Sequence, residues 1–352
     1  MTAPPDLTTM RDRAELALDR LSPRRWGFAP LTSGWSVMSP GLGEVHVARL
    51  GWQSVRNDAG GADALNFLAA LQGEVWGMPP EEWVPANILA ILPDTGGSVL
   101  AAYRADAGWN EEGWLGFALA GGGRSGVLVS HMLGVRADLR GAHDIGWLLK
   151  AIQAWEAVRD GHHAAIWTFD PMRGANARLN LEKLDASVSL LTFDKYGAIR
   201  SDLYGDVPSD RFTAHWDLLA DSTAARLAAV YAGRYIPPTP QDVAHLPTAQ
   251  PASIAPTVRF EIPGDIDVMA REDPASAGEW RREMRRVLGA LLDTADANTG
   301  VRADDPAAIR ITRTTGAYTI TGFATAPDAN GERRNEYILT RRKDADERNQ
   351  PT

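Results

Sequence analysis

One short stretch combines residue types that bind anions. Residues 133–150, LGVRADLRGAHDIGWLLK, begin as an apolar run of strand type, turn at Arg140 and Gly141, and continue with the spacing of an amphipathic helix. A helix that follows a Gly-containing turn presents free backbone N–H groups at the positive end of its dipole, where phosphate oxygens are stabilised. Arg140 adds a positive charge. The same turn also occurs for purely structural reasons, so this pattern alone leaves both interpretations open.

A candidate base lies just before this stretch. His131 belongs to the run GVLVSHMLGV, and an unperturbed imidazole titrates at about pH 6.5, close to the value that a general base needs. In a strand, His131 shares a face with Val129 and Leu133, so a packed histidine with a satisfied nitrogen is the alternative.

Two further side chains follow runs of strand type. Tyr196 in KYG either packs at a strand end or acts as an acid, and Asp170 in TFDP either stabilises the turn before Pro171 or holds a substrate ammonium. Arginines near them could bind a carboxylate through a planar two-point contact, although most arginines are simply solvated. The candidates are Arg173, Arg178 and Arg211.

The composition excludes several classes of protein. The 352 residues suit one large domain or two linked ones, and no apolar run approaches the roughly 20 residues of a membrane span. With no cysteine, the chain has no disulfide, thiolate metal site or cysteine nucleophile. A net charge of -9 disfavours nucleic acid and anionic membranes, so we expect a small-molecule partner. His162 and His163 lack further ligands at metal spacing, so we expect no metal.

The elements that must position these residues follow from hydrophobic periodicity. Helices are expected at residues 10–21, 62–76, 85–92, 145–160, 176–184 and 279–292. Strands are expected at residues 43–50, 98–105, 113–120, 126–135, 164–169, 187–193, 257–262, 308–313, 317–323 and 335–341. This order predicts a mixed α/β fold. The start MTAPPDLTTMRDR has no basic segment followed by an apolar block, so we expect no secretory signal and a cytoplasmic location.

Several separate motifs occur in one order. They are QGEVWGMP, SHMLGVRADLRG, WTFDPM, NARLNLEKL, KYG and VPSDR. With the order of expected elements, they resemble the GNAT acyltransferase superfamily, whose acyl-CoA loop has the pattern R/Q-x-x-G-x-G/A. They are most similar to large bacterial members with a C-terminal extension, over residues 62–343. The resemblance implies a mixed, mostly antiparallel central sheet flanked by helices, followed by a structured α/β extension.

The resemblance also implies a division into domains. We expect an N-terminal addition, partly disordered, at residues 1–52 and a GNAT-like acyl-CoA-binding domain at 53–220. A helix and a Pro-rich linker follow at 221–256. The α/β extension then occupies 257–343, and a loose tail 344–352.

In GNAT enzymes the pyrophosphate of coenzyme A lies on the amides of the loop, and the pantetheine enters where two central strands separate. The matching positions are Arg140, Gly141, Ala142, His143 and Gly146 for the phosphates, Leu133, Gly134 and Val135 for backbone pairing with the pantetheine, and Asn176 for the cofactor arm. Some members place a catalytic His or Glu at the position of His131. Many use a Tyr as general acid in L-Y-E-K-L-G, but residues 180–184 here read NLEKL, so Tyr196 is the substitute.

The loop departs from the pattern of the superfamily. One extra residue lies between Gly141 and Ile145, and His143 and Asp144 replace the second glycine. Asp144 is a good helix cap, and its carboxylate is expected to occupy the amides that a phosphate needs. It would also repel the pyrophosphate by on the order of 1 kcal/mol when solvated. A protonated His143 would offset part of this repulsion.

The preferred hypothesis is a transfer of an acyl group from acetyl-CoA or succinyl-CoA to a small-molecule amine, in particular an amino acid. Related proteins are thought to include succinyl-CoA-dependent enzymes that acylate amino acids, notably D-amino acids, alongside N-acylamino acid racemases. A dicarboxylic acyl group would fit the arginines. The altered loop favours a second hypothesis, a non-catalytic GNAT-fold acyl-CoA-binding or regulatory protein. A third is a scaffold whose C-terminal part forms a homodimer surface.

Overall fold

The computed structural model describes residues 7–51, 61–141, 143–197, 209–296, 312–328 and 331–343. Within these ranges the chain divides into two compact units. Unit 1 takes its residues from Met1–Trp167 and Trp216–Arg234, and unit 2 takes them from Thr168–Ile199, Leu203–His215 and Tyr235–Thr352. The boundaries expected after residues 52, 220 and 256 do not coincide with this division. The tail expected at 344–352 lies outside the described residues.

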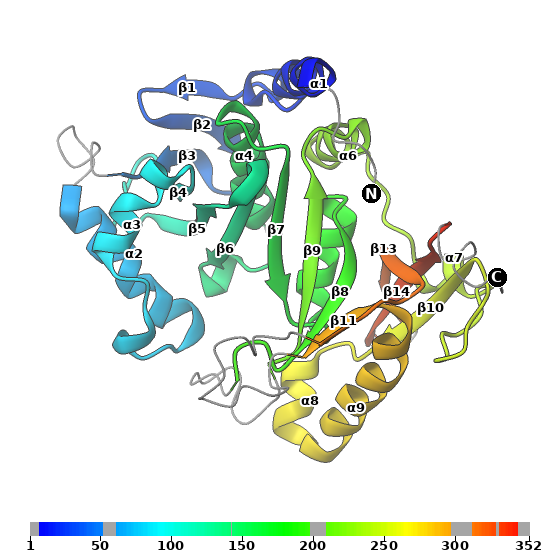
Figure 1. Ribbon diagram of the computed structural model, residues 1–352. Helices are drawn as coiled ribbons and strands as arrows, with labels where there is room; N and C mark the ends of the chain where they lie inside the picture. Colours follow the sequence, from blue (N-terminus) through cyan, green and yellow to red (C-terminus); the bar gives the residue numbers. More distant parts are fainter. Residues whose placement is uncertain are drawn as a thin grey trace, which may run out of the picture. The chain divides into compact units, whose positions relative to one another are not determined.

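Unit 1 contains a sheet whose strands follow one another in sequence order, drawn in blue to green in Figure 1. Its strands are β1 Ala29–Leu31, β2 Gly34–Ser39, β3 Gly43–Arg49, β4 Ser98–Arg104, β5 Trp114–Gly122, β6 Val127–Val135 and β7 Ala164–Phe169. Neighbours are antiparallel up to β6, whereas β6 and β7 are parallel. A parallel pair needs a crossover, which α4 (Ile145–Arg159) supplies. The expected mixed, mostly antiparallel sheet is confirmed.

Neighbouring residues of β5 show which helices cover each face of this sheet. A Cβ on Gly116 would lie 3.1 Å from the Ile145 side chain, so Gly116 faces α4 and lets this helix approach closely. Side chains alternate along a strand, and Phe117 packs on the other face in a core with Leu68 of α2 (Gly61–Trp76) and Leu89 of α3 (Ala86–Ile91). The sheet therefore lies between α4 and the pair α2 and α3.

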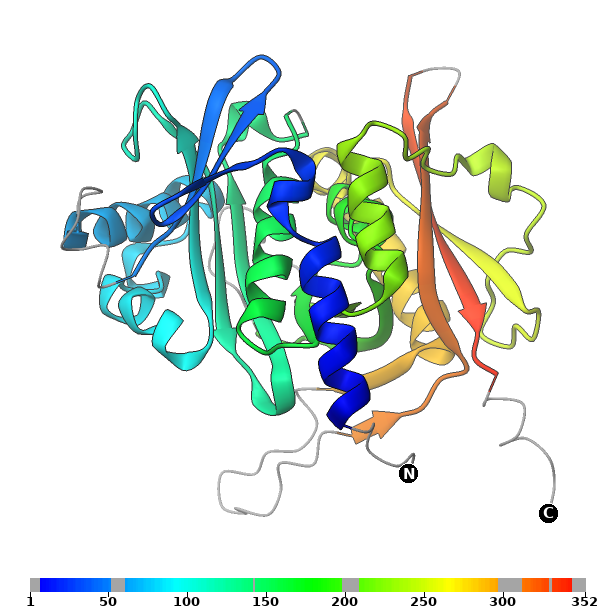
Figure 2. The same ribbon diagram turned by 90° about the horizontal axis from the view of Figure 1, so that it is seen from above.

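Two further helices lie beside α4, as Figure 2 shows: α1 (Leu7–Arg20) and α6 (Asp221–Tyr231). Aromatic contacts join these segments. The ring of Trp147 in α4 stacks on Tyr231 with centroids 5.9 Å apart, and the ring of Trp26 lies 5.7 Å from Trp147. Trp26 follows α1, so the N-terminal segment is packed into unit 1.

The N-terminal segment, expected as a partly disordered addition, forms part of the sheet of unit 1 over the residues that the structure describes. β1, β2 and β3 extend the sheet, and β3 pairs with β4 from Val45↔Arg104 to Arg49↔Leu100.

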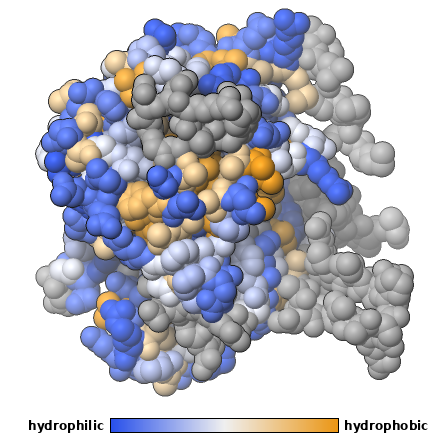
Figure 3. Space-filling model, turned by 90° about the vertical axis from the view of Figure 1, so that its left-hand side faces the viewer, coloured by the Kyte–Doolittle hydropathy of each residue, from blue (hydrophilic) through white to orange (hydrophobic). Residues whose placement is uncertain are grey.

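The other side of unit 1, which carries α2 and α3, faces the viewer in Figure 3. In α3, Leu89 is buried whereas Ile88 and Ile91 stay exposed.

Unit 2 contains the strands of the expected extension and the strand that follows β7 in the sequence. In spatial order these are β9 Arg211–Asp217, β8 Ser187–Phe193, β13 Tyr318–Pro327, β14 Arg333–Arg341 and β10 Thr257–Ile262. β11 (Asp293–Asp296) pairs with β8 and with β12 (Thr312–Thr314). Its helices are α5 Gly174–Ala177, which a π-helical turn Arg178–Lys183 continues, α7 Pro240–Val243, α8 Ile266–Glu272 and α9 Pro274–Leu291.

The long helix α9 docks within unit 2, as its amphipathic pattern predicts. Met284, Val287 and Leu288 are fully buried. In the described ranges of both units, no helix has the length and the apolar character that crossing a bilayer requires.

Candidate functional site

β6 and β7 separate after a short paired segment. Their parallel pairing runs from Val127↔Ala164 to Val129↔Ile166, and in the described chain no pairing joins them beyond this point. β6 continues to Val135, paired along its other edge with β5. From Ser130 onward, the edge of β6 on the side of β7 therefore has main-chain groups without a strand partner.

The direction of these main-chain groups follows from the pairing with β5. The Arg136 N–H donates to the Leu115 carbonyl at 3.0 Å, and main-chain groups alternate between the two edges of an antiparallel strand. Leu133 and Val135 therefore direct their groups toward the open edge. Leu133 and Val135 are two of the residues whose backbone is expected to pair with a pantetheine, and that pairing stays a prediction.

Gly134 has a different part in this arrangement. By the same alternation its main-chain groups point toward β5. A Cβ on Gly134 would lie 2.7 Å from ring atoms of Phe117, so a side chain here would displace the Phe117 ring. The absence of a side chain at Gly134 thus leaves room for the Phe117 ring. The strand geometry does not favour the contact with a pantetheine amide that was expected of Gly134.

His131 is the extra residue of a β-bulge. Leu119 pairs with Met132 and Ala120 pairs with Ser130, so no residue of β5 lies opposite His131. Bulges redirect a side chain and interrupt the alternation of faces. The His131 side chain is exposed, and desolvation by the surrounding protein lowers the pKa of its imidazole below the ordinary value. Because the ring stays open to water, this desolvation is partial.

Asp144 does not cap α4 in the way that the sequence predicts. It occupies the N-cap position, but its φ of 52° is left-handed and its side chain makes no capping hydrogen bond. The first helical bond runs from the Leu148 N–H to the Asp144 carbonyl. The expectation that the Asp144 carboxylate occupies the first-turn amides is therefore wrong. Helix geometry leaves the N–H groups of Ile145, Gly146 and Trp147 without intrahelical acceptors, so they can receive phosphate oxygens.

The loop before α4 has an unusual backbone. Gly141 has a φ of +78°, which favours glycine, and a Cβ on it would meet no atom within 4 Å. His143 also has a positive φ. Its Nδ1 donates to the carbonyl of Pro40 at 2.9 Å, so its ring packs on the turn between β2 and β3. Ala142, which is also expected in the phosphate loop, lies outside the described residues.

Arg140 holds this loop through its side chain. Its Nε donates to the Val135 carbonyl at 3.2 Å, and its terminal nitrogen donates to the carbonyl of Val75 in α2 at 2.9 Å. The guanidinium therefore connects the loop, the end of β6 and the end of α2. In an anion site, Arg140 mainly holds the loop in position. Its positive charge acts on the anion from this fixed place.

The remaining predicted residues lie in unit 2. Asp170 is buried and forms a two-point ion pair with Arg281 of α9, at 3.2 and 3.1 Å. It also accepts from the N–H of Met172 at 2.9 Å. These contacts are typical of a structural carboxylate, because a buried pair fills the positions that a substrate ammonium would need.

Tyr196 lies at the surface of unit 2. Its hydroxyl shares a hydrogen bond with the hydroxyl of Thr168 at 2.8 Å, and the guanidinium of Arg211 lies 5.4 Å from the centre of its ring. The Ser209 side chain accepts from the Tyr196 N–H, and Asp210 binds Arg285 at 2.6 and 2.8 Å. Ser209 and Asp210 of the VPSDR motif thus position the KYG turn. Tyr196 as an acid stays a prediction from the sequence.

The structure separates the other arginines that were expected near a substrate. Arg173 binds Asp267 at 3.0 Å, whereas Nε of Arg178 is buried with no hydrogen-bond partner in the described chain. The N–H of Asn176 donates to the Arg173 carbonyl. Among the guanidinium groups of these arginines, that of Arg211 is the one for which the described chain shows a contact with another predicted site residue, Tyr196.

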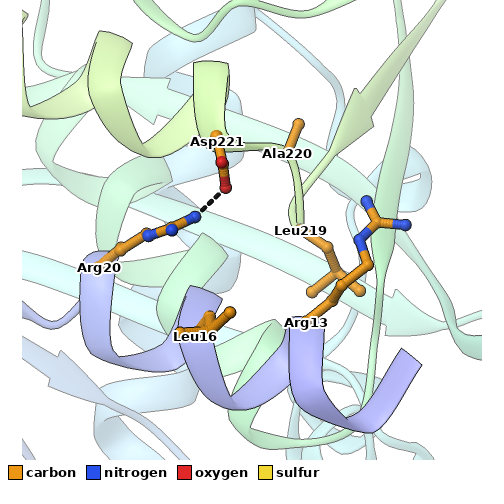
Figure 4. A pocket seen from close by; sticks show the side chains of 6 residues that line it. All are labelled: Arg13, Leu16, Arg20, Leu219, Ala220 and Asp221. Carbon is orange, nitrogen blue, oxygen red and sulfur yellow. Dashed lines mark hydrogen bonds and ion pairs between the residues drawn. The ribbon is translucent and has the colours of Figure 1, made fainter. Parts of the chain in front are cut away.

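One cavity of about 340 Å³ lies elsewhere in unit 1, between α1 and the start of α6 (Figure 4). An ion pair of Arg20 and Asp221 crosses it, and none of the predicted site residues lines it. Within the described ranges no cluster of three metal-ligating side chains is found.

Solved structures of acetyltransferases resemble this chain. No protein-family model and no curated protein matches the sequence. An IAA acetyltransferase from Bacillus cereus is 15% identical, with 49% of this chain and 99% of that chain covered and a TM-score of 0.34. YncA, a putative acetyltransferase from Salmonella typhimurium solved with acetyl-CoA, is 16% identical, with 49% and 94% covered and a TM-score of 0.35. An N-acetyltransferase from Staphylococcus aureus is 15% identical, with 46% and 96% covered and a TM-score of 0.36.

At these identities and TM-scores, the likeness does not by itself assign a family. The chain itself shows the order of α2, α3, three antiparallel strands, α4 and a parallel β7, together with a bulged strand that separates from its neighbour. This is the element order that the sequence predicts, and it forms a mixed, mostly antiparallel α/β fold to which further strands and helices are added.

Proposed function

We propose that the chain is an acyl-CoA-dependent N-acyltransferase that acts on the amine of a small molecule. One observation carries this proposal: the open edge of β6 leads directly into a loop and a helix N-terminus whose amides the Asp144 carboxylate does not cap. A thioester of coenzyme A has amides in its pantetheine arm and a pyrophosphate at its other end. The two parts of the site offer hydrogen-bonding groups of the matching kinds.

The residues of unit 1 fit such a substrate in three ways. Leu133 and Val135 present main-chain groups to the pantetheine. The first-turn amides of α4 donate to the pyrophosphate. Gly141 leaves open space, since a Cβ on it would meet no neighbour.

His131 is the base in this proposal. The acceptor amine must lose a proton before its nitrogen attacks the thioester carbonyl carbon, because an ammonium has no free electron pair. His131 takes this proton, directly or through a water, and its lowered pKa keeps the imidazole neutral at pH 7. A C–N bond then forms, the C–S bond breaks, the nitrogen releases its second proton to give the neutral amide, and the departing thiolate takes up one proton. Tyr196 is the sequence candidate for that donor.

The substrate is proposed as an amino acid, and the acyl group as acetyl or succinyl. Arg211 is the sequence candidate for binding a substrate carboxylate, through a planar two-point contact. Arg173 was also expected to bind this carboxylate. Its guanidinium already binds Asp267, so it is less available to a substrate than its position in the sequence suggests.

Titration calorimetry with coenzyme A, acetyl-CoA and succinyl-CoA tests the binding, and thiol release in the presence of L- and D-amino acids tests the transfer. Binding in the micromolar range with thiol release on at least one amino acid is the expected result. Absence of binding by coenzyme A and both of its thioesters would reject the enzyme and the binding protein alike.

A second candidate is a non-catalytic acyl-CoA-binding protein with this fold. Two observations favour it: Arg140 already donates to the Val135 carbonyl on the open edge, and Leu181 in the run NLEKL stands where the pattern L-Y-E-K-L-G has its Tyr. Micromolar binding of acetyl-CoA without thiol release across a broad amine panel is the outcome that would select it.

A further inference from the structure

A buried lysine lies on the face of α4 that contacts the sheet of unit 1. Lys150 is only 2% exposed. Its Nζ donates to the Ser130 hydroxyl at 2.9 Å and to the side-chain carbonyl of Gln153 at 3.0 Å, and it lies 3.8 Å from the centre of the Trp167 ring. The Ser130 hydroxyl donates in turn to Gln153 at 2.9 Å. A serine, a glutamine, a lysine and a tryptophan thus form one buried network.

This network lies where β6 and β7 separate. The last pair of their parallel ladder is Val129↔Ile166. Ser130 is the next residue of β6, and Trp167 is the next residue of β7. Lys150 therefore contacts both strands at the first position where no backbone hydrogen bonds join them. The bulged His131 follows Ser130 directly.

A buried lysine is energetically unfavourable at this position. Burial without a carboxylate partner costs free energy, and in the described chain no Asp or Glu oxygen lies within 4.0 Å of Nζ. An apolar side chain of similar length would fill the space, and Ser130 would keep its bond to Gln153. Stability of the core alone therefore does not account for an amine here, whereas a need to hold in place two strands that no longer pair with each other does.

We propose that Lys150 is a positioning residue, which fixes the opening between β6 and β7 by holding Ser130 and Trp167. The inference rests on the proposed function, because the opening matters only where it receives the pantetheine arm of an acyl-CoA. Lys150 itself does not touch the substrate in this arrangement. It acts through Ser130 on the main chain that leads into His131 and Leu133.

The test compares Lys150→Met, Ser130→Ala and the double variant in the full chain. Val158→Met serves as a control, because Val158 is a buried residue two turns further along α4. Melting temperature reports on the fold, calorimetry with acetyl-CoA gives Kd, and thiol release gives KM and kcat. Ser130→Ala removes a single oxygen, so it keeps the test valid should Lys150→Met fail to fold.

The expected result is a split between binding and stability. Lys150→Met melts no lower than the wild type, but its Kd and KM for acetyl-CoA rise about tenfold, while kcat changes less than about threefold. Ser130→Ala shifts Kd in the same direction, and the double variant is no weaker than Lys150→Met, because both changes remove one linkage. Val158→Met keeps the Kd of the wild type.

Two outcomes would overturn the inference alone. In the first, the wild type binds acetyl-CoA and the Lys150→Met and Ser130→Ala variants bind it equally well, which makes the lysine an ordinary core residue. In the second, the effects of the two single changes multiply in the double variant, which shows that Lys150 does not act through Ser130. If the wild type itself binds no acetyl-CoA, the proposed function fails, and this inference fails with it.

Discussion

The guanidinium of Arg140 donates a hydrogen bond to the carbonyl of Val75 at 2.9 Å, across 65 residues of sequence. Val75 lies in the last turn of α2, and the Nε of the same guanidinium donates to Val135 at the end of β6. A single planar side chain thus joins the loop before α4 to two elements. Its fork of donors is what allows both contacts at once.

Substitution of Arg140 separates position from charge. Arg140→Ala is expected to raise the Kd for coenzyme A about tenfold, because the loop loses both of its contacts. Arg140→Lys keeps the charge but offers one ammonium, which cannot replace a fork with two separate acceptors, so it should recover little of the affinity. Calorimetry at low and moderate salt measures this. Full recovery by Arg140→Lys would instead show that Arg140 acts as a charge near the phosphates.

Protonation of His131 should determine how kcat/KM declines at acidic pH. Desolvation lowers its pKa, so the imidazole becomes protonated, and the base is lost, only as the pH falls below about 6.5. In the wild type, kcat/KM should therefore decline below that pH. In His131→Gln, kcat should be about a hundredfold lower with no such decline, while the Kd for acetyl-CoA changes little. An unaltered profile in His131→Gln would assign the proton transfer to another group.

The hydrophobic pattern predicted most elements of unit 1, because its strands and helices are strongly periodic. The run GVLVSHMLGV became β6, and the stripe of Ile145, Leu148 and Leu149 became the buried face of α4. β9 was missed although Phe212, Ala214 and Trp216 alternate along it and are all buried. That alternation was the available signal.

The site was harder to predict, because its geometry depends on backbone conformation and distant contacts. Capping preference predicts a bond from the Asp144 side chain, but two successive left-handed residues change the direction of that side chain. The contact of His143 with Pro40 and the pair of Asp170 with Arg281 join residues more than 100 positions apart. Local spacing carries no information on such pairs. Lys150 gave no signal either, because it lies outside the stripe of Ile145, Leu148 and Leu149, on a part of the helix where a lysine is ordinarily exposed.

The ion pair of Asp170 and Arg281 yields a test of structural against catalytic roles. Removal of one partner leaves a buried charge uncompensated, so Asp170→Asn should lower the free energy of unfolding by about 3 kcal/mol. The double variant Asp170→Asn/Arg281→Met should lose less than the sum of the single changes. Denaturant unfolding measures both. If Asp170→Asn had unchanged stability but a much lower kcat, Asp170 would be assigned to substrate binding and not to the structure.

Lys150 should make stability depend on pH in the alkaline range. Burial lowers its pKa from 10.5 to about 7, so between these values the unfolded chain binds a proton that the folded chain does not. The free energy of unfolding therefore rises with pH between 7 and 10.5, by at most about 1.4 kcal/mol per pH unit for one proton. The same contribution is lost as the pH falls from 10.5 toward 7. Other groups titrate in the same range, but they cancel in a comparison with Lys150→Met. Urea unfolding of both proteins at pH 7.5, 8.5 and 9.5 should show the wild type gaining on the variant at each step. A constant difference would mean that the ammonium stays charged inside unit 1, with the Trp167 ring and the Ser130 hydroxyl solvating it as well as water does.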